Sequence, residues 1–187
     1  VGFNYRMTEI QSIIGINEVE RLDNWNLAKR FQFAKMYDDA FAGFKGIKKL
    51  PVNTAERKNS YWWYPVLIDL DVLDTDATHI VKEMVKNNVP CYGIQWPEAY
   101  QEAAYREKNG FGTVKFPFNS KEYSDPASTD YTKYDCKVAK SLRAQTVSLF
   151  LHPSWDEIHI QRVIDTFKSV LEKHYKFQKI QSIPLKL

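Results

Sequence analysis

The sequence predicts an α/β fold, in the form of an α+β small domain in which a long N-terminal helical arm precedes a small sheet covered by helices. Two observations support this prediction. Apolar residues recur at helical spacing in the first 45 residues, and after them short runs of aromatic and branched residues alternate with further helical segments. Alternating strands and helices are typical of helices packed on one face of a sheet.

The helical arm begins at a capping box. Thr8 and Gln11 have the spacing at which a threonine hydroxyl accepts from an amide three residues on and a glutamine reaches back. Apolar spacing then predicts a helix over 8–22, and Asp23 offers a break with a fresh N-cap. A second helix is expected over 27–43, which completes an arm of roughly 35 residues.

The first strand is expected over 61–70, where the run YWWYPVLIDL is rich in aromatic and branched residues. Pro65 has no amide to donate, which indicates an edge position or a bulge. Because side chains alternate along a strand, Tyr61 and Trp63 are expected on one face and Trp62 on the other.

The middle of the chain contains a helix and a long irregular stretch. Asp76 can cap a helix over 77–87, and a short strand is expected over 89–92. No period is sustained over 93–135, apart from a possible short helix near 98–108. Irregular stretches this long inside a compact domain are usually functional.

The C-terminal third returns to regular patterns. We expect a helix over 136–143, a strand over 146–151 and a last helix over 156–174. The chain therefore divides into an interdomain helical arm, residues 1–45, and a C-terminal small domain, residues 46–187.

Composition excludes several classes of protein. The 187 residues carry a formal net charge of +3, too small an excess of basic residues to indicate nucleic acid or an acidic membrane surface as a partner. No apolar run approaches the ~20 residues that span a bilayer. Two cysteines, Cys91 and Cys136, form neither a disulfide framework nor a metal-ligand set, and they predict reduced thiols in a cytoplasmic protein.

His152 stands out among the four histidines. It follows an apolar strand directly, and strand ends in α/β sheets are common places for ligands. A purely structural role for His152 remains open. The other three, His79, His159 and His174, lie among polar neighbours in predicted helices, and we expect them on the solvated surface.

Two further groups of residues could bind ligands. Asn4 and Arg6 precede a helix N-terminus, where an anion can be held by the arginine, an amide donor and the helix dipole. An asparagine turn beside a surface arginine explains them equally well. The aromatic run that begins at Tyr61 could stack on a sugar or a base, or it could pack on both faces of the sheet.

These segments resemble one family. Gly2-Phe3-Asn4-Tyr5-Arg6-Met7-Thr8-Glu9-Ile10-Gln11 is similar to a motif of the DegT/DnrJ/EryC1/StrS sugar aminotransferases. Later segments resemble the family in the same order: the aromatic strand from Ser60 to Pro65, the Val89-Pro90-Cys91 and Trp96-Pro97 segment, and the run from Cys136 that ends in Leu151-His152-Pro153. The resemblance covers nearly the whole chain.

The resemblance implies the fold of aspartate aminotransferase and the cofactor pyridoxal 5′-phosphate (PLP). Family members typically transfer an amino group from glutamate or glutamine to a keto sugar, often nucleotide-linked, for surface polysaccharides or secondary metabolites, and a few are dehydratases. Their active site lies between the subunits of a homodimer. By resemblance, Asn4 contacts the PLP phosphate of the neighbouring subunit, and Arg6 and His152 lie near the substrate. Tyr61 and Trp96 are further candidates for lining the sugar site.

The sequence also departs from the family. The lysine that forms the Schiff base with PLP lies upstream of the Asn-x-Arg motif in these enzymes, and no lysine here matches it. Phe150 stands where a proline is more usual before the Leu-His-Pro run. The chain begins at Val1 without a methionine, and the resembling enzymes are about twice as long, so we expect a C-terminal portion that is inactive alone.

Two other interpretations remain open at this stage. The chain could be a truncated, non-catalytic module that acts in dimerisation or sugar binding. It could also be an unrelated α/β binding domain that shares only the fold.

Overall fold

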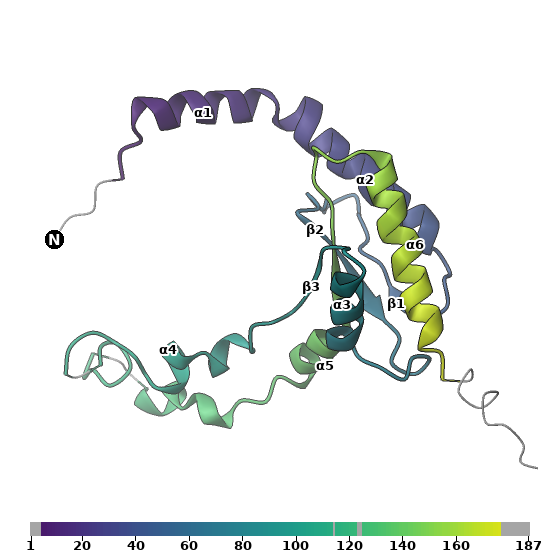
Figure 1. Cartoon of the computed structure of the whole chain (residues 1–187). Helices are drawn as coiled ribbons and strands as arrows, with labels where there is room; N and C mark the ends of the chain where they lie inside the picture. Colours follow the sequence, from purple (N-terminus) through teal and green to yellow (C-terminus); the bar gives the residue numbers. More distant parts are fainter. Residues whose placement is uncertain (1–4, 114, 123–124, 177–187) are drawn as a thin grey trace, which may run out of the picture.

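In the computed structural model, which describes residues 5–113, 115–122 and 125–176, the chain forms a helical arm and a four-stranded sheet with helices on one face (Figure 1). The predicted fold class is therefore confirmed. None of the helices in this part of the chain combines the length and the apolar character that crossing a bilayer requires.

The arm consists of helix α1 (Glu9–Glu20), a π-helical segment (Leu22–Leu27) and helix α2 (Ala28–Phe41). The predicted capping box is present: the Gln11 amide donates to the Thr8 hydroxyl at 3.3 Å, and the Thr8 amide donates to the Gln11 side chain at 2.9 Å. The arm divides into two α-helices near Asp23, as predicted, but the fresh N-cap expected at Asp23 was wrong. The wider turn keeps its hydrogen bonds within the backbone, so no cap is needed and the arm continues.

The sheet contains strands β1 (Ile47–Lys49), β2 (Trp63–Ile68), β3 (Cys91–Gly93) and β4 (Thr146–Phe150). Their order is β1-β2-β4-β3, and every neighbouring pair is antiparallel. Sequence patterns missed β1, because it is only three residues long and two of them are exposed lysines.

Pro65 lies within β2, opposite Ser148 of β4. On the other side of β2, β1 pairs only with Leu67 and Ile68. Pro65 therefore lies beyond the end of the β1 ladder, where a missing amide costs no hydrogen bond. β2 is nevertheless an inner strand that pairs regularly with β4 at Pro65, so the expected edge position or bulge was wrong for the strand itself.

One face of the sheet carries the hydrophobic core. Helices α2, α3 (Ala77–Lys86) and α6 (Glu157–Lys173) cover this face (Figure 1). The strands contribute alternate side chains that are almost completely buried: Tyr64, Val66, Ile68, Cys91, Val147 and Leu149. Burial raises the pKa of the Cys91 thiol to about 12.

Tyr37 of α2 ties the arm to the sheet. Its hydroxyl donates to the Phe150 carbonyl oxygen at 2.7 Å, and its ring centroid lies 4.9 Å from that of Tyr64. Burial raises the pKa of both phenols, and the carboxylate of Asp38 adds to the effect at Tyr64. The C-terminal half of the arm therefore shares the core of the sheet domain, and the predicted division near residue 45 remains a prediction.

Between β3 and β4 the chain leaves the sheet. As expected, this excursion has little regular structure: short 3-10 turns, helix α4 (Ala103–Arg106) and helix α5 (Lys137–Gln145), which leads directly into β4. Aromatic rings hold it together, because Tyr105 packs edge-on against Phe118 and Tyr131.

Candidate functional site

The face of the sheet that no core helix covers carries a connected group of aromatic side chains. Trp63 of β2 lies edge-on to Tyr92 of β3, with ring centroids 4.6 Å apart, and 5.0 Å from Phe150 of β4. Phe150 in turn stacks on His152 and meets Trp155 edge-on at 4.8 Å. We call these five residues the aromatic surface.

A pocket of about 390 Å³ opens at the β3 end of the aromatic surface. The rings of Trp63 and Tyr92 line it together with Trp96, and Ser148 of β4 adds a hydroxyl group. Trp96 is 74% exposed, so most of its ring is available to a ligand. Aromatic faces with a few polar groups are typical of sites that bind sugars and bases.

His152 lies at the other end of the aromatic surface. The Ser154 amide donates to His152 Nδ1 at 3.2 Å, and the Ser154 hydroxyl lies 2.6 Å from the same atom. Because a backbone amide can only donate, Nδ1 accepts, and a neutral ring carries its hydrogen on Nε2. Local contacts thus orient His152 with a donor at Nε2.

Tyr61 has different surroundings from those expected. It has a positive φ of 51° and precedes β2, so the predicted alternation with Trp63 does not hold. Its ring is 5% exposed and stacks on Tyr64 of the core face. Its hydroxyl accepts from Asn53 at 3.0 Å. The structure does not bring Tyr61 to the aromatic surface, and its role in lining a sugar site stays a prediction.

Arg30 of α2 holds this irregular entry to β2. It donates from Nη1 to the Tyr61 carbonyl oxygen at 2.8 Å and to that of Trp62 at 3.3 Å. Burial lowers the pKa of Arg30. The arm therefore contacts the backbone directly before Trp63, where β2 begins.

Arg6, which was expected to bind an anion together with Asn4, lies at the N-terminal end of the arm. Arg6 is exposed and precedes α1, whereas Asn4 lies outside the described residues. The helical segment over 9–27 rises about 28 Å at ~1.5 Å per residue, which separates Arg6 from the sheet domain (Figure 1). The Gln11 backbone amide already donates to Thr8 and is not available to an anion. Arg6 is the described cationic side chain that precedes α1.

Helix α1 has no buried residue. Five large apolar side chains along it are 57% to 72% exposed: Ile10, Ile13, Ile14, Ile16 and Val19. Apolar surfaces of this kind mark contacts with other polypeptides. The arm therefore has the character of a segment that packs against protein outside this chain.

The expectation that three histidines are solvated holds only in part. The side chain of His174 is 15% exposed and lies between two carboxylates, whereas that of His79 is 54% exposed. Spatial neighbours from α3 cover His174, and its polar sequence neighbours gave no sign of them.

Most of the aromatic surface was not predicted. Tyr92, Phe150 and Trp155 were not among the candidate site residues, although alternation along β4 places Phe150 on the face opposite Leu149. That pattern could have indicated Phe150. The contribution of Tyr92 depends on β3 lying beside β4, which no local pattern shows.

One family model and several known proteins are similar to this chain. A model of the DegT/DnrJ/EryC1/StrS aminotransferase family matches residues 1–128. GDP-perosamine synthase of Caulobacter vibrioides is 25% identical over 171 residues, which are 91% of this chain and 39% of that protein. An uncharacterized protein of Methanocaldococcus jannaschii is 28% identical over 116 residues, 62% of this chain and 29% of that protein.

Solved structures share the fold. The aminotransferase PseC of Helicobacter pylori, involved in the biosynthesis of pseudoaminic acid, matches with a TM-score of 0.70 and 19% identity, over 92% of this chain and 40% of that one. An aminotransferase from Psychrobacter cryohalolentis matches with a TM-score of 0.71 and 24% identity, over 92% and 41%. The chain thus spans about 40% or less of the length of these relatives.

Proposed function

Because the chain belongs to the DegT/DnrJ/EryC1/StrS aminotransferase family, we propose that it forms the C-terminal part of a PLP-dependent enzyme that transfers an amino group from glutamate or glutamine to a keto sugar. The observation that carries this proposal is the aromatic surface with its pocket, beside an arm whose apolar side chains are exposed. A relative named GDP-perosamine synthase supports a nucleotide-linked sugar as the acceptor.

The chain fits part of a PLP site. PLP, when bound, withdraws electrons from the carbon that carries the amino group. The guanidinium of Arg6 suits the cofactor's phosphate or a phosphate of the substrate, and Asn4 would add an amide donor. No lysine lines the pocket of the aromatic surface among the described residues. In this proposal, the lysine that holds PLP belongs to the large domain of the complete enzyme.

The aromatic surface would bind and orient the acceptor. Trp96 and Trp63 offer apolar ring faces to the sugar ring, and the Ser148 hydroxyl can accept or donate to a sugar hydroxyl. His152 presents Nε2–H as a donor, because Ser154 occupies Nδ1. A donor there can hold the carbonyl oxygen or a neighbouring hydroxyl of a keto sugar in one position.

The arm would complete a site in a homodimer. Arg6 lies about 28 Å of helix away from the sheet domain, and α1 has no buried residue in this chain. An arm of this length can reach a neighbouring subunit and cover its apolar side chains there. This arrangement supports the proposal that one subunit contributes Arg6 to the site of the other.

The decisive experiment compares two equally exposed tryptophans. In an enzyme with the coding sequence upstream of Val1 restored in frame, Trp96→Ala should raise KM for the keto sugar about 5-fold or more, because stacking contributes about 1–3 kcal/mol. Trp62→Ala is the control, since Trp62 is also 74% exposed but lies outside the pocket. Equal effects of the two substitutions would contradict the proposed sugar site.

A second measurement tests the division of labour. The 187-residue chain mixed with PLP should show no stoichiometric absorbance band of lysine-bound cofactor. A stoichiometric band from this chain alone would show that it carries the lysine itself. The alternative function, a non-catalytic module for dimerisation or sugar binding, requires that the restored enzyme also lacks transaminase activity while the chain still self-associates in sedimentation.

A further inference from the structure

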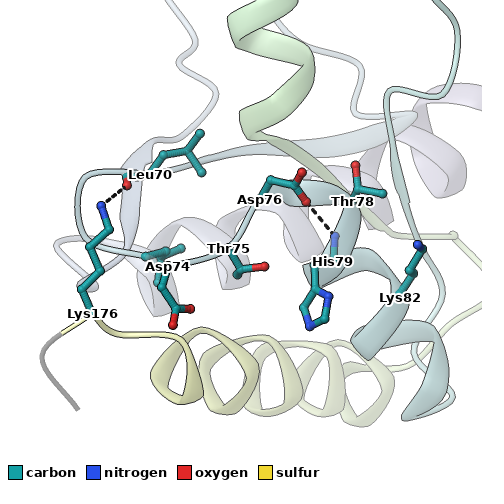
Figure 2. Close-up of a pocket in the computed structure, with 9 residues that line it drawn as sticks. Leu70, Asp74, Thr75, Asp76, Thr78, His79, Lys82 and Lys176 are labelled. Carbon is teal, nitrogen blue, oxygen red and sulfur yellow. Dashed lines mark hydrogen bonds between the residues drawn. The ribbon is translucent and has the colours of Figure 1, made fainter. Parts of the chain in front are cut away.

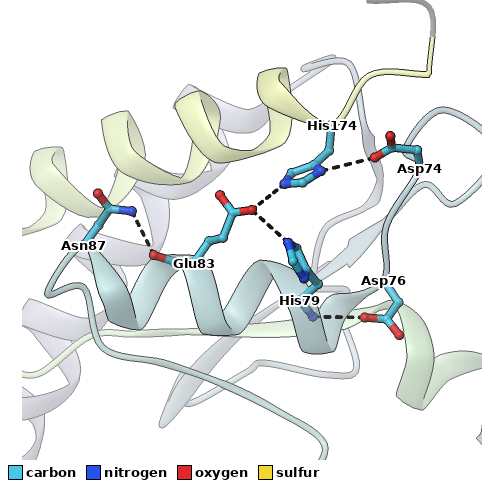
Figure 3. Close-up of polar contacts among 6 residues, drawn as sticks. All are labelled: Asp74, Asp76, His79, Glu83, Asn87 and His174. Carbon is cyan, nitrogen blue, oxygen red and sulfur yellow. Dashed lines mark hydrogen bonds and ion pairs between the residues drawn. The ribbon is translucent and has the colours of Figure 1, made fainter. Parts of the chain in front are cut away.

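A cluster of metal-ligating side chains lies in the helical layer, on the side of the sheet away from the aromatic surface. His79 and Glu83 come from α3, and His174 is the C-cap residue directly after α6 (Figure 3). His79 Nε2 lies 2.9 Å and His174 Nε2 2.6 Å from the same oxygen, Glu83 Oε1. One carboxylate oxygen is therefore approached by two imidazole nitrogens from different helices.

We propose that His79, Glu83 and His174 bind a divalent transition-metal ion of the Zn²⁺ type, with Asp74 orienting His174. The potential ligand atoms all lie within 4.8 Å of one another. Two imidazoles and one carboxylate form a donor set that suits Zn²⁺, with a fourth position left for water.

The hydrogen bonds around His174 leave a place for a cation. His174 Nδ1 lies 3.1 Å from Asp74 Oδ1, while Nε2 faces Glu83. A doubly protonated imidazole donates to both carboxylates, whereas a neutral imidazole has one N–H and donates to only one of them. When the neutral ring donates from Nδ1 to Asp74, the lone pair of Nε2 points at Glu83 Oε1, and a metal ion bound by both atoms replaces this repulsion by attraction. A histidine held by a carboxylate while it binds a metal is a recurrent arrangement in metal sites.

The backbone places the ligands in advance. His79 and Glu83 are four residues apart on one helix, so their side chains lie on the same face. The Asp74 amide donates to the His174 carbonyl oxygen at 3.0 Å, which fixes the end of α6 beside the start of α3. Ligand atoms around tetrahedral Zn²⁺ lie about 3.3 Å apart, given bonds of ~2.0–2.1 Å. The two short contacts would lengthen by only about 0.4–0.7 Å.

Solvent can reach the cluster. The side chain of His79 is 54% exposed and borders a pocket of about 710 Å³ that Asp74 and Asp76 also line (Figure 2). Lys82 and Lys176 line the same pocket, and their positive charges oppose a bound cation. Lys176 Nζ is engaged by the carbonyl oxygens of Leu70 and Asp71, at 2.7 and 3.1 Å. Three carboxylates, those of Asp74, Asp76 and Glu83, outweigh the two lysines in charge.

The test is a Zn²⁺ titration of the chelator-treated chain against a chromophoric competitor. All variants carry Cys136→Ser, because the exposed thiol could supply a foreign ligand. We expect one Zn²⁺ per chain, and a loss of affinity of at least about 100-fold in His174→Gln and in His79→Gln. Asp74→Asn should lose about 10-fold to 100-fold, as an orienting residue does. Zn²⁺ should also raise the unfolding temperature of the chain that has the unsubstituted cluster, and it should leave the unfolding temperature of His79→Gln unchanged.

The matched control is His159→Gln, in the first turn of the same α6. Glutamine suits the capping-box position that His159 occupies, so the helix start is preserved. This variant should bind Zn²⁺ within twofold of the parent. If His174→Gln fails to fold by circular dichroism, the half-exposed His79 decides the question. Equal Zn²⁺ affinity of the parent and His79→Gln, or equal losses of affinity in His79→Gln and His159→Gln, would overturn the proposal. The three residues would then form a hydrogen-bonded cluster that binds no metal.

Discussion

Replacing Arg30 by methionine should destabilise the chain more than its partly exposed position suggests. The substitution removes the donor to the Tyr61 carbonyl oxygen at 2.8 Å, the donor to that of Trp62 at 3.3 Å and the bond to Asn26 Oδ1 at 2.7 Å. Hydrogen bonds from a charged group contribute about 1.5–3 kcal/mol each. Because water can reach the Trp62 carbonyl and the Asn26 side chain after truncation, only the bond to the Tyr61 carbonyl is lost without replacement, and we expect a total loss of about 2–3 kcal/mol.

The assay is urea unfolding followed by tryptophan fluorescence. With a slope of about 2 kcal/mol per molar urea, the midpoint should fall by about 1–1.5 M. The control is Lys35→Met in the same helix, which removes an exposed ion pair with Asp39. Pairs of that kind contribute about 0.3–0.5 kcal/mol, so its midpoint should move by only about 0.2 M.

Arg30→Lys separates charge from geometry. A single ammonium group cannot reach both carbonyl oxygens and Asn26 as the planar guanidinium does, so this variant should recover less than half of the loss. If the free energies of unfolding of Arg30→Met and Lys35→Met differ by less than about 0.5 kcal/mol, the contact between the arm and the entry to β2 does not stabilise the fold. That result would refute the reasoning.

Four further outcomes can be measured on the same chain. In the folded chain at pH 8, iodoacetamide should modify Cys136 and spare Cys91, whose pKa burial raises to about 12, and mass spectrometry should count two modified thiols only in urea. Because the unfolded Cys91 thiol ionises near its ordinary pKa of 9.0, its contribution to stability should be intact below pH 9 and lost as the pH rises toward 12. Phe167→Ala should cost about 3–5 kcal/mol in urea unfolding, whereas Ile158→Ala on the exposed side of α6 should cost less than about 0.5. Asp76→Ala should cost about 0.5–2 kcal/mol, since it removes the side-chain cap of α3, and an unchanged urea midpoint would contradict that role.

Local sequence patterns predicted the elements that carry a capping residue or an apolar period within their own residues. Helices α3 and α6 were placed within two residues of their bounds, because a capping residue precedes a regular apolar stripe in each. Strand β1 gave no such signal, since its three residues include two lysines and its pairing with β2 decides its conformation. The π-helical segment after α1 was read as a break, because Asp23 favours a cap in isolation.

The candidate site could be predicted only in part for a similar reason. His152 and Trp96 carry chemical signals in the sequence and lie at the two ends of the aromatic surface. Tyr61 carries the same kind of signal but faces the core, because its positive φ departs from strand geometry. The cluster of His79, Glu83 and His174 joins residues about 90 positions apart, and only the packing of α6 on α3 brings them together.

The order of strands has a consequence for how the chain folds during synthesis. Strand β4 lies between β2 and β3, and neither of these pairs with the other. The sheet therefore cannot close until residues 146–150 have left the ribosome, more than 80 residues after β2. Until then the apolar side chains of β2 and α3 lack their central partner, and we expect pauses in translation over 94–145 to prolong this aggregation-prone state.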